Sequence, residues 1–359
     1  MKIHFHQQQK GIALVMVMIV VTVLAVMAGE FAYLMKVETK LARNSSFEAD
    51  YVWAGRSGIE RARWILAMSS IGPRGAVDSL GSKWAGGPGD TNGPLADVDL
   101  KHFQLNDAVS FGLEIEDHDR KFNINIADEM VLKEALTKVI GVEEGTVADA
   151  IAHSVQDWID SDDNVRPGGA ETSYYQGLNP PVFCKNGPLD DISELLMIQG
   201  VTPAIYWGSK GASHMQTVHQ MNRNARRSRF EEVTYEYGMV DLFTTTSSRL
   251  VNINTAPAEV LRMFPGIDEN VAQAIIAARS GPDQVPGTED DGFANPQAIG
   301  MIPGMNPGAA GQFARFFTVR SLVFEVKVDV NAGGMTRRYI GLLRRNGGRD
   351  IQILNMYWQ

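Results

Sequence analysis

Residues 10–30 read KGIALVMVMIVVTVLAVMAGE, and the uncharged apolar run Ile12–Gly29 inside this stretch decides the fold. At about 1.5 Å per helical residue, roughly 18 residues extend about 27 Å, nearly the thickness of a bilayer core. Lys2, Lys10 and the starting amine lie on the N-terminal side, which favours a cytoplasmic N-terminus with the rest of the chain outside. The sequence therefore predicts one transmembrane helix at 12–29.

The segment before this helix is polar. An ordinary secretory signal peptide has its apolar core upstream of the cleavage site and loses that core on processing. Residues 1–11 contain no apolar core, and the apolar run follows them. We expect a leader, 1–11, that is removed by cleavage after Gly11 and leaves Ile12 as the first mature residue. A plain, uncleaved N-terminal anchor is the alternative.

The helix is expected to continue beyond the membrane. No proline occurs between Glu30 and Pro73, and residues 31–69 are rich in strong helix formers. We expect 30–70 to leave the membrane on its outer side and dock on a soluble head, with a bend near Asn44-Ser45-Ser46, where helix propensity is weak. Several apolar residues at helical spacing are expected to form the buried stripe: Tyr51, Val52, Ile59, Trp64, Ile65 and Met68.

Composition bounds the rest of the chain. With 359 residues and 44% hydrophobic content, the chain is long enough for two domains or more and for a sizeable core. The formal net charge of −9 disfavours a broad electrostatic attraction to nucleic acid. The single cysteine, Cys184, excludes an intramolecular disulfide, so an exported head needs a larger core or a bound metal instead. Cys184 itself is expected to be a small, partly buried apolar residue.

Four strands are expected, one before and three after a long central region. Within 71–120, the stretch 72–106 is rich in Gly, Pro, Asp and Ser and is predicted to be a long connection, whereas Val109–Glu116 alternates as a strand. Within 317–359 we expect an antiparallel sheet with one face on the long helix. Its strands are Arg320–Val330, Thr336–Arg345 and Asp350–Trp358, joined by turns at Asn331–Gly334 and Asn346–Arg349.

The central region, 121–316, is predicted to be a mostly helical domain that contains an internal repeat. The segment Asn123–Ala127 (NINIA) reappears as Asn252–Ala256 (NINTA). The second copy continues through Pro265-Gly266, with apolar helix-like runs on both sides, which is similar to a helix-hairpin-helix motif with Gly at the tight turn. Weaker echoes occur at 195–206 and 302–305. The paired Asn side chains are expected to cap or bridge backbone rather than to bind a ligand.

The helix-hairpin-helix-like motif carries negative charge, which argues against DNA binding. In DNA-binding helix-hairpin-helix modules a second Gly lets backbone amides approach phosphate. Here Asp268 stands two places after Gly266, with Glu269 beside it, and two carboxylates repel a phosphate. We therefore expect the motif to serve packing or subunit contact, and nucleic-acid binding to be the less favoured reading.

The strongest candidate chemical site is an acidic run at 154–175. Its oxygen-bearing residues follow the 1, 3, 5, 12 spacing of an EF-hand calcium loop if Asp160 is counted first. Two neighbouring carboxylates join them, so that the predicted metal ligands are Asp157, Asp160, Asp162, Asp163, Asn164 and Glu171. Val165 replaces the turn glycine, and Pro167 imposes another path, so we expect calcium in a loop that is not a true EF-hand. A solvated acidic turn with Arg166 pairing locally is the alternative.

Known catalytic patterns are missing from the sequence. There is no P-loop, no G-x-S-x-G elbow and no H-E-x-x-H, and His214 and His219 are expected to be surface residues. Asp190 and Asp191 form a second, weaker acidic pair, expected to cap a helix. We predict that the protein is not an enzyme. A peripheral enzyme with an acidic metal site is the alternative.

Taken together, several segments resemble the K-type minor pseudopilin of the bacterial type II secretion system. They are Lys10-Gly11 with the anchor helix, DWIDSDD (157–163), RPGGAETSYY (166–175), NGPLDDISELLMIQGVTP (186–203), NINTAPAEVL (252–261) and the C-terminal sheet. The resemblance implies an α+β, pilin-like fold. In that fold a long N-terminal helix lies on an antiparallel sheet, and a large, mostly helical domain with helix-hairpin-helix-like repeats is inserted between strands.

The resemblance also implies processing and a place in an assembly. It implies cleavage after Gly11 and N-methylation of Ile12 by the prepilin peptidase. Ordinary pilins carry Glu at the fifth mature position, where it neutralises the amine of the preceding subunit; here that position is Met16. A subunit without this carboxylate fits the tip of the pseudopilus, where no earlier amine needs a partner.

The implied function is initiation of a periplasmic pseudopilus from the inner membrane. The implied partners are the I- and J-type minor pseudopilins, the other pseudopilins and the inner-membrane assembly platform. Two other readings stay open from the residues: a membrane-tethered DNA-uptake protein that uses its helix-hairpin-helix copies, and a minor pilin of a type IV pilus system.

Overall fold

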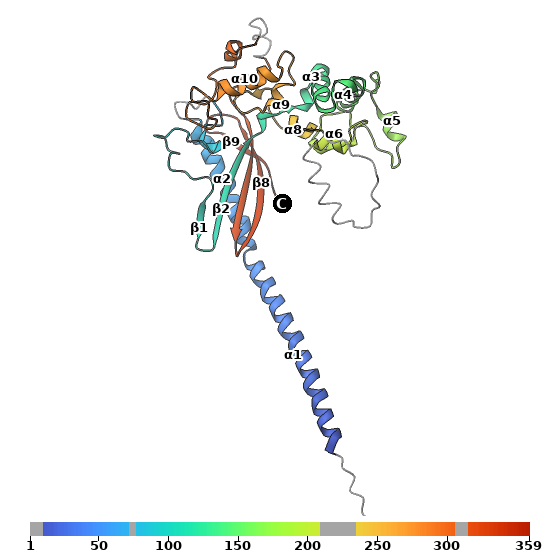
Figure 1. Ribbon diagram of the computed structural model, residues 1–359, viewed down its shortest axis with the longest axis vertical. Coiled ribbons are helices and arrows are strands. Elements are labelled where there is room, and N and C mark those ends of the chain that lie inside the picture. The colour runs from blue at the N-terminus through green and yellow to red at the C-terminus, as the bar shows by residue number, and fades with distance from the viewer. Residues whose placement is uncertain (1–9, 72–76, 209–234, 306–314) are drawn as a thin grey trace, which may run out of the picture.

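The described chain begins with two consecutive helices, of which the first projects from the head and the second lies beside the sheet (Figure 1). The computed structural model describes residues 10–71, 77–208, 235–305 and 315–359. Helix α1 spans Lys10–Ser46 and α2 spans Glu48–Ser69, with one turn residue, Phe47, between them. The interruption lies directly after the Asn44-Ser45-Ser46 patch, where the sequence predicted a bend.

Helix α1 projects away from the head (Figure 1). The stretch Ile12–Ala42 is long and apolar enough to cross a membrane; its most apolar 18-residue window has a mean hydropathy of 2.9 and is not buried against the protein. An apolar helix that finds no protein surface to cover it suits a hydrocarbon environment. The expected transmembrane segment, 12–29, lies entirely within this helix.

Helix α2 packs on the sheet through one face. Tyr51, Ile59 and Ile65 are buried as predicted, whereas Val52, Trp64 and Met68 are only partly buried. Small residues make up half of the buried face, which lets the helix approach the strands closely. The buried residues of α2 are Tyr51, Ala54, Gly55, Gly58, Ile59, Ala62, Ile65 and Leu66.

The sheet has five antiparallel strands in the order β1-β2-β7-β8-β9. Four of them were expected from the alternation of apolar and polar residues. Their bounds are Phe103–Asn106 for β1, Val109–Asp117 for β2, Val323–Ala332 for β7, Met335–Arg345 for β8 and Ile351–Trp358 for β9. The turn between β7 and β8 contains Gly333 and Gly334, both at positive φ, which glycine adopts without strain.

The first strand, β1, lies where the sequence predicted none. The stretch 72–106 was predicted to be a connection, yet Phe103–Asn106 pairs with β2 as an edge strand. The ring of Phe103 stacks on that of Phe111, with 5.1 Å between centroids. A tertiary contact of this kind stabilises a four-residue strand that its own composition does not predict.

The helical domain is inserted between two strands that are neighbours in the sheet. Asp117, at the end of β2, pairs with Phe324 near the start of β7, so the chain leaves the sheet and returns to the same place. The inserted residues lie at the end of the sheet opposite α1 (Figure 1). They have their own hydrophobic core, separate from the one between α2 and the sheet. The helices are α3 (Glu129–Ile140), α4 (Gly145–Ile159), α5 (Thr172–Gln176), α6 (Pro203–Trp207), α8 (Met239–Leu242), α9 (Ala258–Leu261) and α10 (Glu269–Arg279).

The two NIN segments occupy equivalent positions in this domain. The side chain of Asn125 donates to the carbonyl oxygen of Leu189 (3.0 Å) and accepts from its N–H (2.7 Å). Asn254 makes the same pair of hydrogen bonds with Phe293, at 3.2 and 2.8 Å. The prediction that these asparagines bridge backbone is therefore confirmed, and the internal repeat is a repeat of structure.

Short parallel strand pairs accompany the repeat and were not predicted. β3 (Phe122–Asn123) pairs with β4 (Phe243–Thr244), and β5 (Val251–Asn252) pairs with β6 (Phe317–Thr318). Each pair joins segments far apart in the sequence, and each strand has only two residues. Local periodicity carries no signal for strands of that length.

The hairpin turns of the helical domain use glycine in the left-handed region. Gly200, Gly266 and Gly304 have φ of +85°, +82° and +88°. After the middle turn, the side chain of Asp268 accepts from the N–H of Val271 (2.9 Å) and caps α10. The N-terminus of α10, the helix that follows the Pro265-Gly266 turn, is thus already occupied by a carboxylate.

Candidate metal site

Helix α4 positions two carboxylates at its C-terminal end. Its apolar face is buried in the core of the inserted domain, and the helix continues through Ile159. Asp157 lies on the last turn and Asp160 caps it, so a spacing of three residues places both on one side of the helix end. Asp157 is completely buried, and Asp160 is partly exposed.

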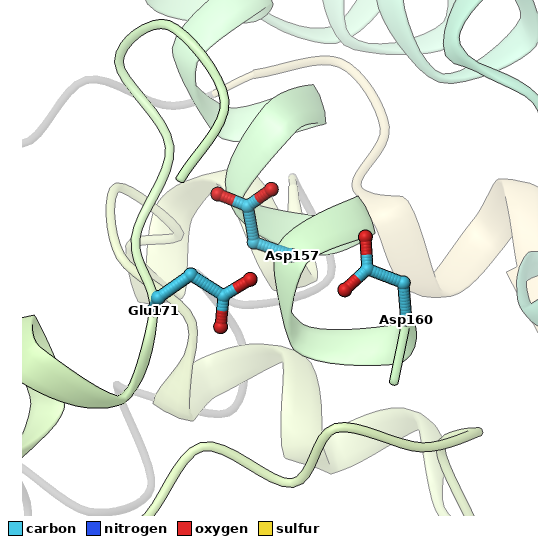
Figure 2. Close-up of side chains that lie close together, drawn as sticks. All are labelled: Asp157, Asp160 and Glu171. Atoms are coloured by element: carbon cyan, nitrogen blue, oxygen red, sulfur yellow. The ribbon is translucent and has the colours of Figure 1, made fainter. Parts of the chain in front are cut away.

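A returning loop brings a third carboxylate to the same place. Glu171 precedes α5 and is only 1% exposed. Tyr175 of α5 packs edge-on against Trp158 of α4, with 4.9 Å between ring centroids, and this contact fixes α5 beside the helix end. Figure 2 shows the side chains of Asp157, Asp160 and Glu171 close together, and each offers a ligand atom within 4.8 Å of those of the others.

Glycine is required where the loop passes over Asp157. A Cβ on Gly169 would lie 2.1 Å from Oδ2 of Asp157, and Gly168 has a φ of +79°. His153 of α4 holds the loop from the other side, since its Nδ1 lies 2.7 Å from the carbonyl oxygen of Pro167. The loop path imposed by Pro167 and the glycines therefore shapes the acidic cluster.

Two of the six predicted metal ligands use their carboxylates in other hydrogen bonds. Asp162 accepts from the backbone N–H of Asn164 (2.8 Å), and Asp163 accepts from the hydroxyl of Thr172 (2.7 Å) and from the amide of Asn186 (3.3 Å). The structure brings together Asp157, Asp160 and Glu171, drawn from a helix end and a returning loop. This arrangement differs from an EF-hand, as the replacement of the turn glycine by Val165 led us to expect.

The electrostatics of the cluster fit a bound cation. Both carboxylate oxygens of Glu171 are buried with no donor nearby except the weakly donating thiol of Cys184, and Oδ1 of Asp160 is buried without a partner. Burial, followed by the negative charges of Asp157 and Asp160, raises the pKa of Glu171 to about 7. A buried carboxylate without a donor is costly unless a cation neutralises it. The donors are all oxygens, which suits a hard cation such as calcium or magnesium.

Arg166, which the alternative interpretation paired with the acidic turn, also lies at the site. Nη1 of Arg166 lies 2.7 Å from Oδ1 of Asp157 and 2.5 Å from Oδ2 of Asp160. Arg166 therefore pairs with two of the three carboxylates, although its single charge balances only one of them, and leaves Glu171 without a positive partner. Both readings of the acidic run, the metal site and the local arginine pair, correspond to real features of the structure.

A second acidic cluster was missed by the sequence analysis. Asp283, Asp290 and Asp291 gather in the loop that follows α10, and their oxygens also lie within 4.8 Å of one another. Asp291 is buried, and its Oδ2 accepts from the N–H of Gly287 (2.5 Å). The available signal was the repeat itself, because this loop follows α10 as the first acidic loop follows α4.

Cys184 and Asp191 lie outside the acidic cluster. Cys184 is partly buried, its Sγ lies 3.7 Å from the carbonyl oxygen of Asp157, and burial raises the pKa of its thiol to about 11. An unreactive, partly apolar cysteine is what the sequence led us to expect. Asp191 caps a 3-10 helix, Ile192–Met197, by accepting from the N–H of Ser193 (2.8 Å). His214 and His219 lie outside the described residues.

The processing residues lie at the start of α1. Ile12 and Met16 are 67% and 64% exposed on this helix. Gly11 precedes them in the same helix, and residues 1–9 lie outside the described part of the chain. The prediction of cleavage after Gly11 stays a prediction.

Two sequence models of known families match the chain. The model for type II secretion system protein K, first domain, matches residues 103–208, which include the candidate metal site. A helix-hairpin-helix motif model matches residues 246–318, which include the Pro265-Gly266 turn. The two matches cover the two halves of the structural repeat.

Curated relatives carry the same name as the first of these models. The putative type II secretion system protein K of Escherichia coli K12 is 26% identical over 218 residues, and the type II secretion system protein K of Aeromonas hydrophila is 24% identical over 216 residues. The Klebsiella pneumoniae protein of the same name is 24% identical over 218 residues. Each alignment covers 56% of this chain and 61% of the relative's length, so the chain spans about three fifths of the curated relatives it matches.

A solved structure shows the same fold. A chain of the GspK-GspI-GspJ complex from the type II secretion system of enterotoxigenic Escherichia coli superposes with a TM-score of 0.61 at 17% identity. The superposition covers 89% of this chain and 99% of the other. The long N-terminal helix, the antiparallel sheet and the inserted helical domain are therefore a fold that this chain shares with the solved chain. The matching sequence model and the curated relatives are likewise those of type II secretion system protein K, to which this chain is similar.

Proposed function

We propose that this chain is a non-enzymatic minor pseudopilin at the tip of a type II secretion pseudopilus, where it initiates assembly and supports protein secretion across the outer membrane. The observation that carries the proposal is the position of the inserted domain. It lies at the end of the sheet opposite the apolar helix α1 (Figure 1). A bulky domain at that end blocks the stacking of another subunit above it, which suits a first subunit.

The membrane anchor supports the proposed location. The apolar part of α1 suits a single span of the inner membrane, with the N-terminus in the cytoplasm and the head in the periplasm. Cleavage after Gly11 by the prepilin peptidase, with N-methylation of Ile12, belongs to this proposal. Mass spectrometry of the membrane fraction tests it, since a mature chain that begins with methylated Ile12 is expected.

Met16 supports the tip position. A lone charge in the bilayer costs about 2.5 to 3.5 kcal/mol on insertion scales, so a carboxylate there is useful only next to a partner amine. A first subunit has no earlier amine to neutralise. We expect Met16→Glu to leave the head folded and to impair pseudopilus initiation and secretion, while the apolar control Met16→Leu retains both. Normal secretion and initiation in Met16→Glu, with membrane insertion verified, would argue against the tip role.

The proposed partners are the I- and J-type minor pseudopilins. The superposed solved chain belongs to a complex of GspK with GspI and GspJ. We extend this association to the present chain, and add the other pseudopilins and the inner-membrane assembly platform as later contacts. Co-expression of the full chain with tagged I- and J-type subunits should yield a ternary complex on affinity purification. Failure to recover all three in detergent would count against this part.

Calcium is the proposed ligand of Asp157, Asp160 and Glu171, where it would neutralise the cluster and hold the acidic loop against α4. The full chain in detergent should melt at a clearly higher temperature with calcium than with chelator, and magnesium should have a smaller effect. Asp160→Ala should abolish the gain. Asp162→Ala is the matched control, because Asp162 lies in the same loop outside the cluster. Equal melting with calcium and chelator would reject the site.

The helix-hairpin-helix match keeps DNA uptake as a second candidate. The observation in its favour is the motif at residues 246–318 with its left-handed Gly266. Asp268 argues against it, since its carboxylate already accepts the N–H of Val271 at the helix terminus where a phosphate would bind. A DNA-binding titration at several salt concentrations separates the two, and we expect no salt-dependent binding.

A further inference from the structure

Arg166 occupies the place where a cation would act in the candidate metal site. Its Nη1 lies 2.7 Å from Oδ1 of Asp157 and 2.5 Å from Oδ2 of Asp160, and its backbone N–H donates to Oδ2 of Asp157 at 3.2 Å. Short contacts between a guanidinium nitrogen and carboxylates are strong, charge-assisted hydrogen bonds. The cluster therefore contains a positive charge of its own.

This internal charge does not complete the site. Three carboxylates face one guanidinium, and Glu171 is the one left over, with both oxygens buried and only the thiol of Cys184, a weak donor, beside them. The oxygens of Glu171 are therefore available to a ligand that also contacts Asp157 and Asp160. A divalent cation carries one more charge than Arg166 and binds several oxygens at about 2.3 to 2.6 Å, so it satisfies all three carboxylates together.

Arg166 and a divalent cation compete for the same oxygens. A calcium ion bound to Oδ1 of Asp157 and Oδ2 of Asp160 would lie next to the guanidinium that contacts both, and two positive charges at such a distance repel each other. The side chain of Arg166 is 35% exposed, whereas that of Asp157 is fully buried. The guanidinium can therefore move towards solvent while the carboxylate stays in place.

We propose that Arg166 is an internal counter-ion of this site, which stabilises the metal-free loop and is displaced when the cation binds. This inference rests on the proposed calcium site and adds a consequence for its strength. Displacing Arg166 costs free energy, so the arginine lowers the apparent calcium affinity. It also keeps the loop ordered when calcium is scarce.

The test compares Arg166→Gln with the parent protein, both as full chains in detergent, by calorimetric titration with calcium. We expect Arg166→Gln to bind calcium about tenfold more tightly, because no guanidinium has to leave. In chelator, Arg166→Gln should melt at a lower temperature than the parent, and saturating calcium should close most of that gap. Arg166→Lys, which keeps the charge without the forked geometry, should fall between the two in affinity.

Lys185→Gln is the matched control. It removes one positive charge from the same part of the domain, but Lys185 pairs with Asp190 (2.7 Å) and Glu194 (2.8 Å) instead of the cluster. Its calcium affinity should change less than twofold. A similar gain in both variants would show that general charge, and not displacement of Arg166, sets the affinity.

Two further outcomes separate the counter-ion from the site itself. Equal or weaker calcium binding by Arg166→Gln, with clear binding by the parent, would overturn the counter-ion role and leave the calcium site standing. No binding by either protein at millimolar calcium would overturn the calcium site and the counter-ion role together. Circular dichroism of both chains in chelator verifies that each is folded before titration.

Discussion

The Nη1 atom of Arg345 lies 2.6 Å from Oδ2 of Asp78, and both side chains are buried where the inserted domain meets the sheet. Arg345 ends β8. Its guanidinium also donates to the carbonyl oxygens of Ser321 (3.1 Å) and Leu66 (3.4 Å), the latter near the end of α2. One buried arginine therefore links the last turns of α2, the end of β8 and the segment that enters β7.

Arg345→Met should destabilise the head strongly. Removing one partner of a buried ion pair costs about 3 to 5 kcal/mol, because the other charge stays buried without compensation. The free energy of unfolding from a denaturant titration measures the loss. Adding Asp78→Leu should recover part of it by removing the stranded carboxylate.

Arg338→Met is the control for this pair. Arg338 also binds a carboxylate, that of Asp329, with two contacts of 2.7 Å, but the pair is exposed. An exposed pair contributes about 0 to 1 kcal/mol. Equal losses in Arg338→Met and Arg345→Met would contradict the view that burial makes the Asp78–Arg345 pair important.

Asp117 should make the stability of the head depend on pH. Its Oδ2 accepts from Ser321 and Thr255 at 2.5 Å each and from Asn252 at 3.3 Å, all inside the same junction. Burial, followed by the charge of Asp119, raises the pKa of Asp117 to about 7. In an unfolded chain the pKa of an aspartate is about 3.9.

The direction of this pH dependence follows from the number of protons that the folded and unfolded chains bind. Between about pH 4 and pH 7 the folded protein keeps a proton on Asp117 that the unfolded chain releases, so the free energy of unfolding falls as the pH rises through this window. Denaturant titrations from pH 5 to pH 8 should show this fall, and Asp117→Asn should flatten it. They are done at saturating calcium, because the pKa of Glu171 is also raised in the metal-free protein. Identical slopes in the two proteins would show that Asp117 does not hold the proton.

Much of the fold could be predicted because its signals are local. An apolar run of membrane length, helix formers without proline and alternating strands each act within a short window. β1 and the short parallel pairs could not be predicted, since they depend on partners distant in sequence. The stacking of Phe103 on Phe111 is one such contact.

The sequence predicted which residues contribute to the candidate site better than it predicted how they are arranged. Counting from Asp160 gave an EF-hand spacing, which assumes that the loop begins there. The loop does begin there, because helix α4 ends at Ile159, but Asp157 of the last helical turn joins Asp160, and the loop brings Glu171 to both. The count did not include Asp157, and it included Asp162, which makes a hydrogen bond within the loop. The path of the loop over the helix end therefore decides which carboxylates meet.

Gly169→Ala should disturb the metal site without adding or removing a charge. The new Cβ would lie 2.1 Å from Oδ2 of Asp157, so the carboxylate or the loop has to move. We expect the calcium-dependent rise in melting temperature to fall by more than half. Gly145→Ala is the control, since a Cβ there meets nothing within 4 Å and the backbone is already helical. An unchanged calcium response in Gly169→Ala would show that this approach does not shape the site.

Gly58→Ala tests the close approach of α2 to the sheet. In a free helix the change is favourable by about 1 kcal/mol. Here the new Cβ would lie 2.3 Å from Cγ1 of Val328, a buried residue of β7, and overpacking of this kind costs about 1 to 3 kcal/mol. We therefore expect a net loss of stability in spite of the better helix former.

A double-mutant cycle with Val328→Ala identifies the cause. Val328→Ala removes the methyl groups that the new Cβ would meet, so Gly58→Ala should cost less in that background, or become favourable. The difference between the two costs is the coupling energy, expected at about 0.5 to 3 kcal/mol for residues in contact. Strictly additive effects in the two backgrounds would mean that the helix and the sheet adjust freely, and that the glycine serves no purpose in bringing α2 onto β7.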